Sequence, residues 1–243
     1  MKIKVAIPSH NRVDILKNKA LKLLEWMDCE ITIFANPKGE AEKYRKEFPD
    51  LRIIEIAEFN WMGKLRAEIL NHYEEGDFIL MIDDDIGELK ILVWKKIESM
   101  SKKISQEFIV KAFNHLKNTW NYLWWICPTD NAFYMSEKIC RNKFIIGCFM
   151  GIIKTDLNFD SEIYWKEDYD FTLQNILTYW WADRHDYIAT DNKYWTTKGG
   201  LQDTKRANIA QRDIQLLKNK YWDIIRDNPK RPNEILLNLR NYG

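Results

Sequence analysis

Short apolar runs and amphipathic stretches alternate along the first third of the chain. The apolar runs predict strands at residues 2–8, 30–35, 52–56 and 77–82, and the helical spacing between them predicts helices at residues 12–26, 38–48 and 62–73. The last of these strands is a continuous apolar run from Phe78 to Ile82. Strands that alternate with helices form a parallel sheet covered on both faces, so this part of the sequence predicts an α/β fold.

The pattern becomes less regular after the acidic residues that follow this strand. We expect helices at residues 106–120 and 166–180 and strands at residues 122–127, 143–154 and 186–189. Two further helices are predicted at residues 204–226 and 233–239, where Asn228-Pro229 and Arg231-Pro232 interrupt the helical spacing. Because no linker, repeat or low-complexity segment separates these elements, we expect the C-terminal segment, residues 193–243, to be mainly helical and to pack on the same domain.

Composition narrows the class of protein. The 243 residues are 46% hydrophobic, which suits one large domain or two closely packed lobes, and no run of eighteen apolar residues occurs. We therefore expect a soluble, cytoplasmic protein with no membrane partner. The four cysteines are scattered without metal-ligand spacing, so neither a zinc site nor a disulfide framework is indicated. Eleven Trp, eleven Tyr and eleven Phe suit stacking on sugar rings or nucleobases, although an aromatic core would explain them equally well.

Charge is unevenly distributed along the chain. The formal net charge is +1, but the segment from Lys193 to the end carries eleven Lys/Arg against five Asp/Glu. A basic segment on a nearly neutral protein suggests a polyanionic or phosphate-bearing partner, whereas solvated helix faces are the alternative explanation.

Three consecutive aspartates, Asp83, Asp84 and Asp85, follow the most apolar predicted strand. Ligands of open parallel sheets gather at the carboxyl ends of strands, so charge chemistry is expected there. Adjacent carboxylates repel one another, and hard oxygen ligands suit Mg²⁺ or Mn²⁺, which keep coordination positions for substrate phosphates. The cluster predicts a metal-assisted diphosphate site, although helix caps, phosphatases and nucleotidyltransferases show similar clusters.

Two motifs together resemble the GT-A family of glycosyltransferases over about residues 2–190. The run Val5-Ala6-Ile7-Pro8-Ser9-His10-Asn11-Arg12 is similar to the turn after the family's first strand, and Ile82-Asp83-Asp84-Asp85-Ile86 is similar to its Asp-x-Asp motif. The resemblance implies a Rossmann-like, mixed but mostly parallel sheet flanked by helices. It also implies a nucleotide-binding half at residues 1–85 and an acceptor half at residues 86–192.

The resemblance also implies roles for individual residues in binding a UDP-sugar or similar donor. The loop with Pro8, Ser9, Asn11 and Arg12 would contact the nucleotide base, Asp83 and Asp84 would face the donor, and Asp85 with Asp83 would hold Mn²⁺ or Mg²⁺. A capping role of Ser9 or Asn11 is compatible with this. Lys64 and Arg66, in the helix before the acidic strand, could pair with the diphosphate, or belong to a solvated helix face.

A second acidic site is predicted at Glu167-Asp168-Tyr169-Asp170. A hydroxyl is a poor nucleophile at neutral pH, so an inverting transfer needs a base, and by analogy with the family Asp168 is that base beside Glu167. Trp165 and Asp170 are expected to contact the acceptor, with the aromatic ring stacking on it. Ordinary capping of the helix by first-turn acids is the alternative.

Three later residues are weaker candidates. The stretch Thr196-Thr197-Lys198-Gly199-Gly200, followed by Lys205-Arg206, suggests a loop that closes over the diphosphate, with Lys198 and Arg206 offsetting the charge of the leaving group. A simple loop between a strand and a helix is equally compatible. His185 is a candidate for the metal shell, although a structural histidine is the commoner case.

The acceptor is suggested by a narrower resemblance. The combination of Asp-Asp-Asp, Glu-Asp-Tyr-Asp-Phe and a late Lys-Gly-Gly resembles the phage DNA-modifying glycosyltransferases associated with thymine- and methylcytosine-oxidising dioxygenases. It implies transfer to a 5-hydroxymethylpyrimidine in double-stranded DNA, in the cytoplasm of the host if the chain is phage-encoded. A transferase acting on a polysaccharide or protein, or a non-catalytic DNA-binding protein with a degenerate transferase fold, are the alternatives.

Overall fold

The computed structural model describes residues 1–57, 61–143, 146–191 and 206–239, except the side chains of residues 206 and 207. The strands are β1 (Ile3–Pro8), β2 (Cys29–Ala35), β3 (Arg52–Glu55), β4 (Phe78–Ile82), β5 (Leu89–Val93), β6 (Lys96–Ser99), β7 (Leu123–Cys127), β8 (Ile139–Arg141), β9 (Phe149–Ile153), β10 (Asp183–Thr190), β11 (Ile225–Asp227) and β12 (Ile235–Leu237). The helices are α1 (Val13–Asn18), α2 (Ala20–Leu24), α3 (Glu40–Glu47), α4 (Met62–Asn71), α5 (Lys102–Thr119), α6 (Glu167–Tyr179) and α7 (Arg206–Lys220).

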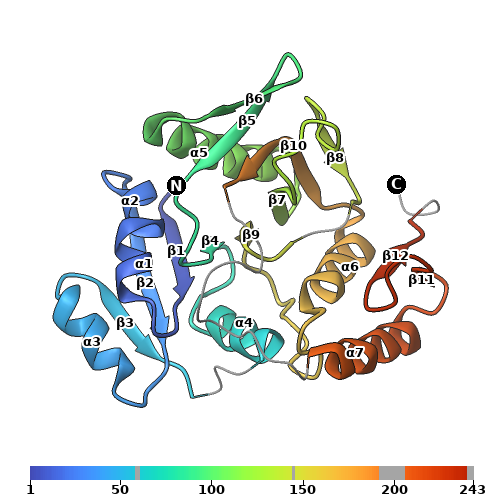
Figure 1. Cartoon of the computed structure of the whole chain (residues 1–243), viewed down its shortest axis with the longest axis horizontal. Helices are drawn as coiled ribbons and strands as arrows, with labels where there is room; N and C mark the ends of the chain where they lie inside the picture. The colour runs from blue at the N-terminus through green and yellow to red at the C-terminus, as the bar shows by residue number, and fades with distance from the viewer. Residues whose placement is uncertain (58–60, 144–145, 192–205, 240–243) are drawn as a thin grey trace.

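One sheet runs through the molecule in the order β3-β2-β1-β4-β9-β7-β10-β5-β6, with β8 also paired to β10 (Figure 1). The first four strands are parallel, as the sequence predicted. β9 is antiparallel to both β4 and β7, so β7 and its parallel neighbour β10 run in the same direction as β4. The predicted mixed α/β sheet is confirmed, and the carboxyl ends of β1, β4, β7 and β10 share one edge of it, here called the site edge.

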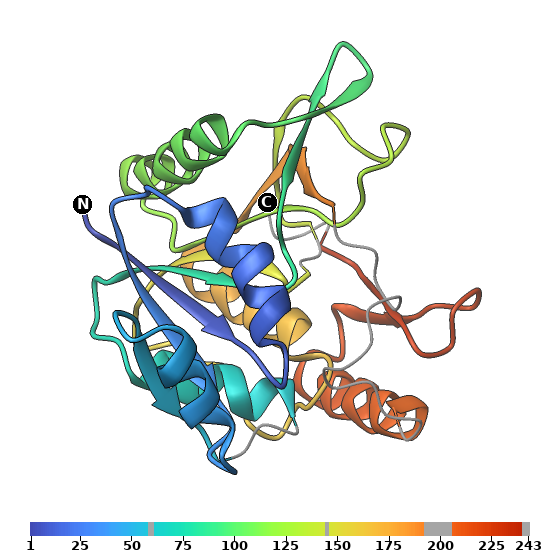
Figure 2. The ribbon, with the colours of Figure 1, turned by 60° about the vertical axis from the view of Figure 1, so that its left-hand side comes forward.

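Alternating side chains of the strands point to opposite faces of the sheet and form two cores. On β4, Leu80 and Ile82 pack with residues of α1, α2, α3 and α5, whereas Ile79 and Met81 pack with residues of α4 and α6. Figure 2 shows the two layers of helices from a second direction. Burial on both faces explains why the central strands read as continuous apolar runs in the sequence.

The C-terminal segment packs on the outside of α6. Apolar side chains of α7, β11 and β12 form a separate cluster with Tyr169 and Leu173 of α6. The predicted second helix at residues 233–239 is wrong, because β12 pairs antiparallel with β11 as a small hairpin. None of the described helices combines the length and apolarity needed to cross a membrane.

Candidate active site

The acidic cluster lies at the site edge, directly after β4. The side chains of Asp83, Asp84 and Asp85 keep 33%, 5% and 17% of their exposure, so Asp84 is buried and Asp83 and Asp85 are partly exposed. Burial raises the pKa of Asp83 to about 7 and that of Asp84 to about 6, in both cases against the opposing effect of nearby arginines. The three carboxylates therefore remain short of positive charge within the folded chain.

Asp84 joins the acidic loop to the loop that follows β1. Its two carboxylate oxygens accept hydrogen bonds from the Ser9 hydroxyl at 2.7 Å and from Nη1 of Arg12 at 3.1 Å. The same Arg12 nitrogen lies 3.4 Å from an oxygen of Asp85. Two motifs that are far apart in the sequence thus form one cluster, in which the buried Ser9 and Asp84 position the loops rather than face solvent.

The loop after β1 is also fixed from α3. The Tyr44 hydroxyl lies 2.7 Å from the Ser9 hydroxyl and accepts the Arg12 backbone N–H at 3.1 Å, while the carboxylate of Glu40 accepts the backbone N–H of Asn11. Asn11 has a φ of 54°, which the loop maintains with these contacts. Pro8 ends β1, so the exposed Asn11 is held on a rigid turn. No motif pointed to Tyr44 or Glu40 in the sequence.

Arg66 connects the two predicted acidic sites. Its guanidinium is buried, donates to Oε1 of Glu167 at 2.8 Å and to the Gly147 carbonyl at 2.7 Å, and lies 3.9 Å from Oδ1 of Asp83. The residue predicted to contact phosphate therefore lies behind the carboxylates and holds them in place. Lys64, one half-turn earlier in α4, is half-buried.

Glycine is required at position 147 because the guanidinium occupies the space of a side chain. A β-carbon added to Gly147 would lie 1.5 Å from Nη1 of Arg66, and one added to Gly63 would lie 1.9 Å from the Ile163 carbonyl oxygen. The first contact allows Arg66 to reach Glu167, and the second brings the start of α4 against the segment that leads to α6. Gly147 did not stand out in the sequence, whereas Gly63 precedes the candidate residues Lys64 and Arg66.

Glu167 and Asp168 begin α6, where the helix dipole favours negative charge. Glu167 is buried against Arg66, whereas Asp168 is half-buried. Burial raises the pKa of both carboxyls, with the Arg66 charge opposing the rise. A carboxylate with a raised pKa is a stronger base than an ordinary aspartate, which suits Asp168 for accepting a proton.

The structure separates Trp165 from Asp170. The Trp165 ring is half-exposed and lies edge-on to Trp61, with ring centroids 6.4 Å apart, near the starts of α4 and α6. Asp170 is fully buried, and its carboxylate accepts from the Tyr221 hydroxyl at 2.7 Å, Lys220 at 2.8 Å and the Gln174 amide at 2.6 Å. Asp170 therefore anchors α7, and the expectation that it contacts an acceptor is corrected.

His185 is also placed away from the acidic cluster. It lies in β10 with 2% exposure, its ring packs edge-to-face on Phe108 and Trp124, and its Nδ1 lies 3.0 Å from the Tyr187 hydroxyl. This aromatic packing leaves His185 without a described contact to Asp83 or Asp85, so the expectation of a metal ligand is corrected. Lys198 lies outside the described residues, as does the side chain of Arg206.

Asp83 and Asp85 are the carboxylates that remain as candidate ligands of a divalent ion. Among the residues that the structure describes, no group of three or more His, Cys, Asp or Glu is arranged to hold a metal. Mg²⁺ and Mn²⁺ commonly use one or two protein carboxylates and take further oxygens from substrate phosphates. Asp83 and Asp85, partly exposed and with pKa values raised by burial, fit a site of that kind.

Comparisons with known proteins identify the family of the chain and show similar folds. Residues 3–200 match the model of the family described as TET-Associated Glycosyltransferase. The fold is similar to crystal structures of S. aureus TarS: a 1–349 form at 13% identity and a TM-score of 0.54, and a longer form at 13% identity and a TM-score of 0.53. These matches cover 90% of this chain in both cases, but only 66% and 40% of the TarS chains. At this identity the likeness concerns the fold alone. No curated protein sequence matches the chain.

Proposed function

The chain belongs to the TET-associated glycosyltransferase family, and from this premise we propose that it transfers a sugar from a UDP-sugar to the hydroxyl of a 5-hydroxymethylpyrimidine in double-stranded DNA. The family makes it a glycosyltransferase, and the donor, the metal and the acceptor are the proposed parts. One observation carries the site: buried Arg66 contacts Glu167 at 2.8 Å and approaches Asp83 at 3.9 Å. Donor-side and acceptor-side carboxylates are thereby held together at one edge of the sheet.

The donor half of the proposal rests on the cluster after β4. Asp83 and Asp85 would hold Mn²⁺ or Mg²⁺, and Asn11 on its rigid turn is available to the nucleotide base. When bound, the ion would offset the negative charge of the diphosphate leaving group. Arg12 donates to Asp84 at 3.1 Å. This contact holds the loop after β1 against the loop after β4 while the donor binds.

The acceptor half rests on the start of α6. A carboxylate oxygen of Asp168 takes the proton of the acceptor hydroxyl. The hydroxyl oxygen of the acceptor then bonds to the anomeric carbon as the bond from the sugar to the diphosphate breaks. Glu167 is held by Arg66 and orients the first turn of the helix, in which Asp168 lies. Burial, which raises the pKa of Asp168, brings its basicity nearer to neutral pH.

The DNA acceptor is supported by two observations. The family is named for its association with TET enzymes. The segment from Lys193 to the end has an excess of basic residues, which suits a polyanion. A polysaccharide or protein acceptor is the alternative that the experiment has to distinguish.

The test is transfer of labelled sugar from UDP-glucose to hydroxymethylated and unmodified DNA duplexes, with Mn²⁺ and with chelator. We expect incorporation only into hydroxymethylated DNA and only with the metal.

Asp85→Ala should abolish metal-dependent donor binding, and Asp168→Asn should lower turnover by a factor of about 100 or more with donor binding preserved. Asp50→Asn, at an exposed turn, is the matched control. Incorporation into a glycan or protein, and none into DNA, would contradict the DNA acceptor.

A further inference from the structure

Three large aromatic side chains stand exposed in two neighbouring segments. Trp94, in the turn between β5 and β6, is 87% exposed, and Phe133 and Tyr134, in the loop after β7, are 85% and 64% exposed. The Phe133 and Tyr134 rings lie 5.0 Å apart in an edge-to-face arrangement. Rings of this size usually bury much of their surface, so three on one part of the surface indicate a partner.

These rings stand on a rigid base. Leu92 of β5, Cys127 of β7, Met135 of the loop and Ala189 of β10 form a small buried cluster beneath them. The backbone N–H of Trp94 donates to Glu137 at 2.8 Å, and Lys90 pairs with Asp130 at 2.6 Å. The hairpin and the loop are thus fastened to each other at three points, and the aromatic rings point outward because the base is filled.

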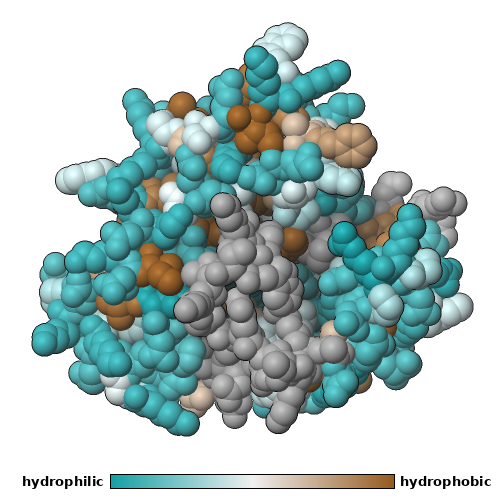
Figure 3. All heavy atoms as spheres, viewed as in Figure 1, coloured by the Kyte–Doolittle hydropathy of each residue, from teal (hydrophilic) through white to brown (hydrophobic). Residues whose placement is uncertain are grey.

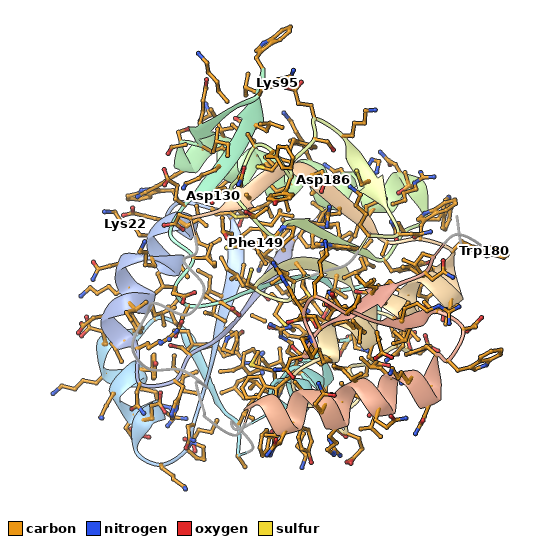
Figure 4. All side chains as sticks on the ribbon, turned by 45° about the vertical axis from the view of Figure 1, so that its right-hand side comes forward. Lys22, Lys95, Asp130, Phe149, Trp180 and Asp186 are labelled. Carbon is orange, nitrogen blue, oxygen red and sulfur yellow. The ribbon has the colours of Figure 1, made fainter. Side chains whose placement is uncertain are left out.

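The hairpin turn also fixes the direction of Trp94. Trp94 and Lys95 have φ values of 50° and 63°, so both occupy the left-handed region that a two-residue hairpin turn requires. Figure 4 shows Lys95 at the outer tip of this hairpin. In the face shown in Figure 3, a small group of apolar side chains lies among hydrophilic ones in the upper part of the molecule, below the tip of the hairpin drawn in Figure 1.

These segments continue directly from the candidate active site. β5 begins four residues after Asp85, and Leu89, its first residue, pairs with Thr190 at the end of β10. The loop that carries Phe133 leaves the carboxyl end of β7, which lies on the site edge with the end of β4. The backbone of Asp191, next in the chain, bonds to the Glu88 carbonyl at 3.2 Å. β5 runs antiparallel to β10 and so leads away from the site edge, which puts Trp94 at the far end of this hairpin from the acidic cluster, beside the loop that carries Phe133 and Tyr134.

The charges around the rings favour an anion. Lys95, Lys96 and Lys138 are exposed, and within the described part of the chain none of them has an ion-pair partner. Of the nearby acids, Asp130 is paired with Lys90, whereas Glu137 accepts the Trp94 backbone N–H and keeps its negative charge, so the three lysines outnumber Glu137 and Glu98 by one. Glu98 is the exposed acid of the hairpin, and it lies on β6 away from the turn.

We propose that Trp94, Phe133 and Tyr134, with Lys95, Lys96 and Lys138, form a docking surface, here called the rim, for the DNA acceptor. The lysines bind phosphates, and the rings stack on bases that are unstacked beside the modified pyrimidine, a combination that binds strands with little sequence preference. This inference rests on the proposed function and adds the surface that receives the acceptor. A neutral glycan would use the rings but not the lysines.

Other exposed tryptophans provide matched controls. Trp26, Trp120 and Trp180 are 90%, 80% and 76% exposed, but they precede β2, β7 and β10 and so lie at the amino ends of strands, opposite the site edge. Figure 4 shows Trp180 projecting from a side of the molecule well away from Lys95. Removing these three indoles changes exposed aromatic area without touching the rim.

The experiment compares Trp94→Ala/Phe133→Ala/Tyr134→Ala with Trp26→Ala/Trp120→Ala/Trp180→Ala. Binding of a labelled hydroxymethylated duplex is measured without donor by fluorescence anisotropy, and the KM for the same duplex and the affinity for UDP with Mn²⁺ are measured separately. We expect the rim variant to lose DNA affinity by at least about tenfold and to raise the KM in parallel, with UDP affinity unchanged. The control variant should bind as the wild type does.

A charge variant gives an independent reading. Lys95→Gln/Lys96→Gln/Lys138→Gln should weaken binding and make the dependence of log affinity on log salt concentration less steep, by about 2–3 in slope. If the rim and control variants have equal DNA affinity, or if the charge variant leaves the slope of log affinity against log salt concentration unchanged, the rim is not the surface that binds DNA.

Failure of the proposed function gives a different pattern. Wild-type protein that binds DNA through the rim but transfers no sugar to it would contradict the acceptor and retain the surface. If the wild-type protein transfers sugar to DNA and the rim variant has the same KM for that DNA, the result would contradict the surface alone. Wild-type protein that neither binds nor modifies DNA would contradict both.

Discussion

At the scale of single residues, the site depends on charges that the fold has buried. Arg66 has 3% exposure, and its contacts with Glu167 and the Gly147 carbonyl replace the hydration that it loses. A buried ion pair adds little stability over a well-packed apolar pair, but loss of one partner leaves the other charge buried and uncompensated. Arg66 therefore matters most through what its removal would leave behind.

We expect Arg66→Met to lower the free energy of unfolding by about 3–5 kcal/mol, because Glu167 would be left without its counter-charge. Adding Glu167→Gln should restore at least half of that loss, whereas turnover should remain low in both variants. Urea denaturation monitored by circular dichroism measures the cycle. If the loss in the free energy of unfolding of the double variant equals the sum of the losses of the two single variants, the two side chains do not act as a pair.

His185 makes stability depend on pH. Burial, followed by the charge of His115, lowers the pKa of His185 to about 3, whereas in the unfolded chain it is near 6.5. The unfolded state then binds the proton more readily, so the stabilisation is fully present above pH 6.5 and is lost as the pH falls towards 3. Between pH 6.5 and pH 5 the loss should be about 1–2 kcal/mol.

The variant His185→Phe keeps an aromatic ring on Phe108 and removes the titrating group. Its free energy of unfolding should fall less over the same pH interval than that of the wild type, whatever its absolute value. Urea titrations at several pH values provide the comparison. Parallel pH profiles for the two proteins would mean that other groups dominate the acid sensitivity.

At the scale of elements, α7 holds the start of α6 in place. Asp213 of α7 is fully buried and accepts the backbone N–H of Trp165 at 2.6 Å, just before Glu167 and Asp168. Asp170 fastens the same two helices from the other side through Tyr221 and Lys220. The C-terminal helix thereby positions the proposed base without contacting it.

We expect Asp213→Ala to cost about 1–3 kcal/mol of stability, because it leaves a buried backbone N–H unsatisfied. It should also lower kcat more than it changes the KM for the donor, since the turn before α6 loses its support. Asp227→Ala removes an exposed pair with Lys218 and should cost less than about 1 kcal/mol. Thermal unfolding measures the stability of both variants, and steady-state kinetics measures their kcat and KM. Equal effects of the two variants would contradict the positioning role of Asp213.

Sequence patterns predicted the central strands, which have both faces buried, and also the more exposed β3 and α3. β1, β2 and β4 read as apolar runs, and α5 and α6 show clear helical spacing, so each was placed within a few residues. β5, β6 and β8 escaped notice because they are short and partly exposed, and the Trp94-Lys95 turn lacks the Asn or Gly that marks most hairpins. The spacing at residues 233–239 suited a helix, but pairing of β12 with β11 decided the outcome.

The site was predictable where its residues lie in continuous motifs. Asp83 to Asp85, the loop ending at Arg12, and Glu167-Asp168 were all found in the sequence, and the structure brings them to one edge of the sheet. Gly147, Tyr44 and Glu40 were missed because their roles arise from contacts over tens of residues, which local patterns do not encode. The antiparallel direction of β9 was missed for the same reason.

At the scale of the whole molecule, the antiparallel β9 joins two halves that the chain builds separately. β9 pairs with β4 on one side and β7 on the other, and Gly151 in its centre leaves room for the Trp124 indole, 2.0 Å from where a β-carbon would lie. Figure 4 shows Phe149, the first residue of this strand, in the middle of the molecule. The proposed donor-side and acceptor-side elements thus share one continuous sheet.

A ligand that binds the donor half should therefore stabilise the fold as a unit. At a concentration of UDP near 100 times its Kd in the presence of Mn²⁺, linkage predicts about 2.7 kcal/mol of stabilisation and a rise in Tm of roughly 5–10 °C. Asp85→Ala should lose this rise, whereas Asp50→Asn should keep it. Differential scanning calorimetry measures the shift, and an equal rise in the Asp85 variant would remove this carboxylate from the donor site.

Arg66 fills the space above Gly147, so the residues that evolution can accept at these two positions, 81 residues apart, depend on each other. A descendant that acquires any larger residue at 147 has to give up the guanidinium, and one that shortens the side chain at 66 no longer needs a glycine opposite it. Substitutions at these two places should therefore be inherited together, and a homologue that altered one alone would be expected to have lost its enzymatic competence.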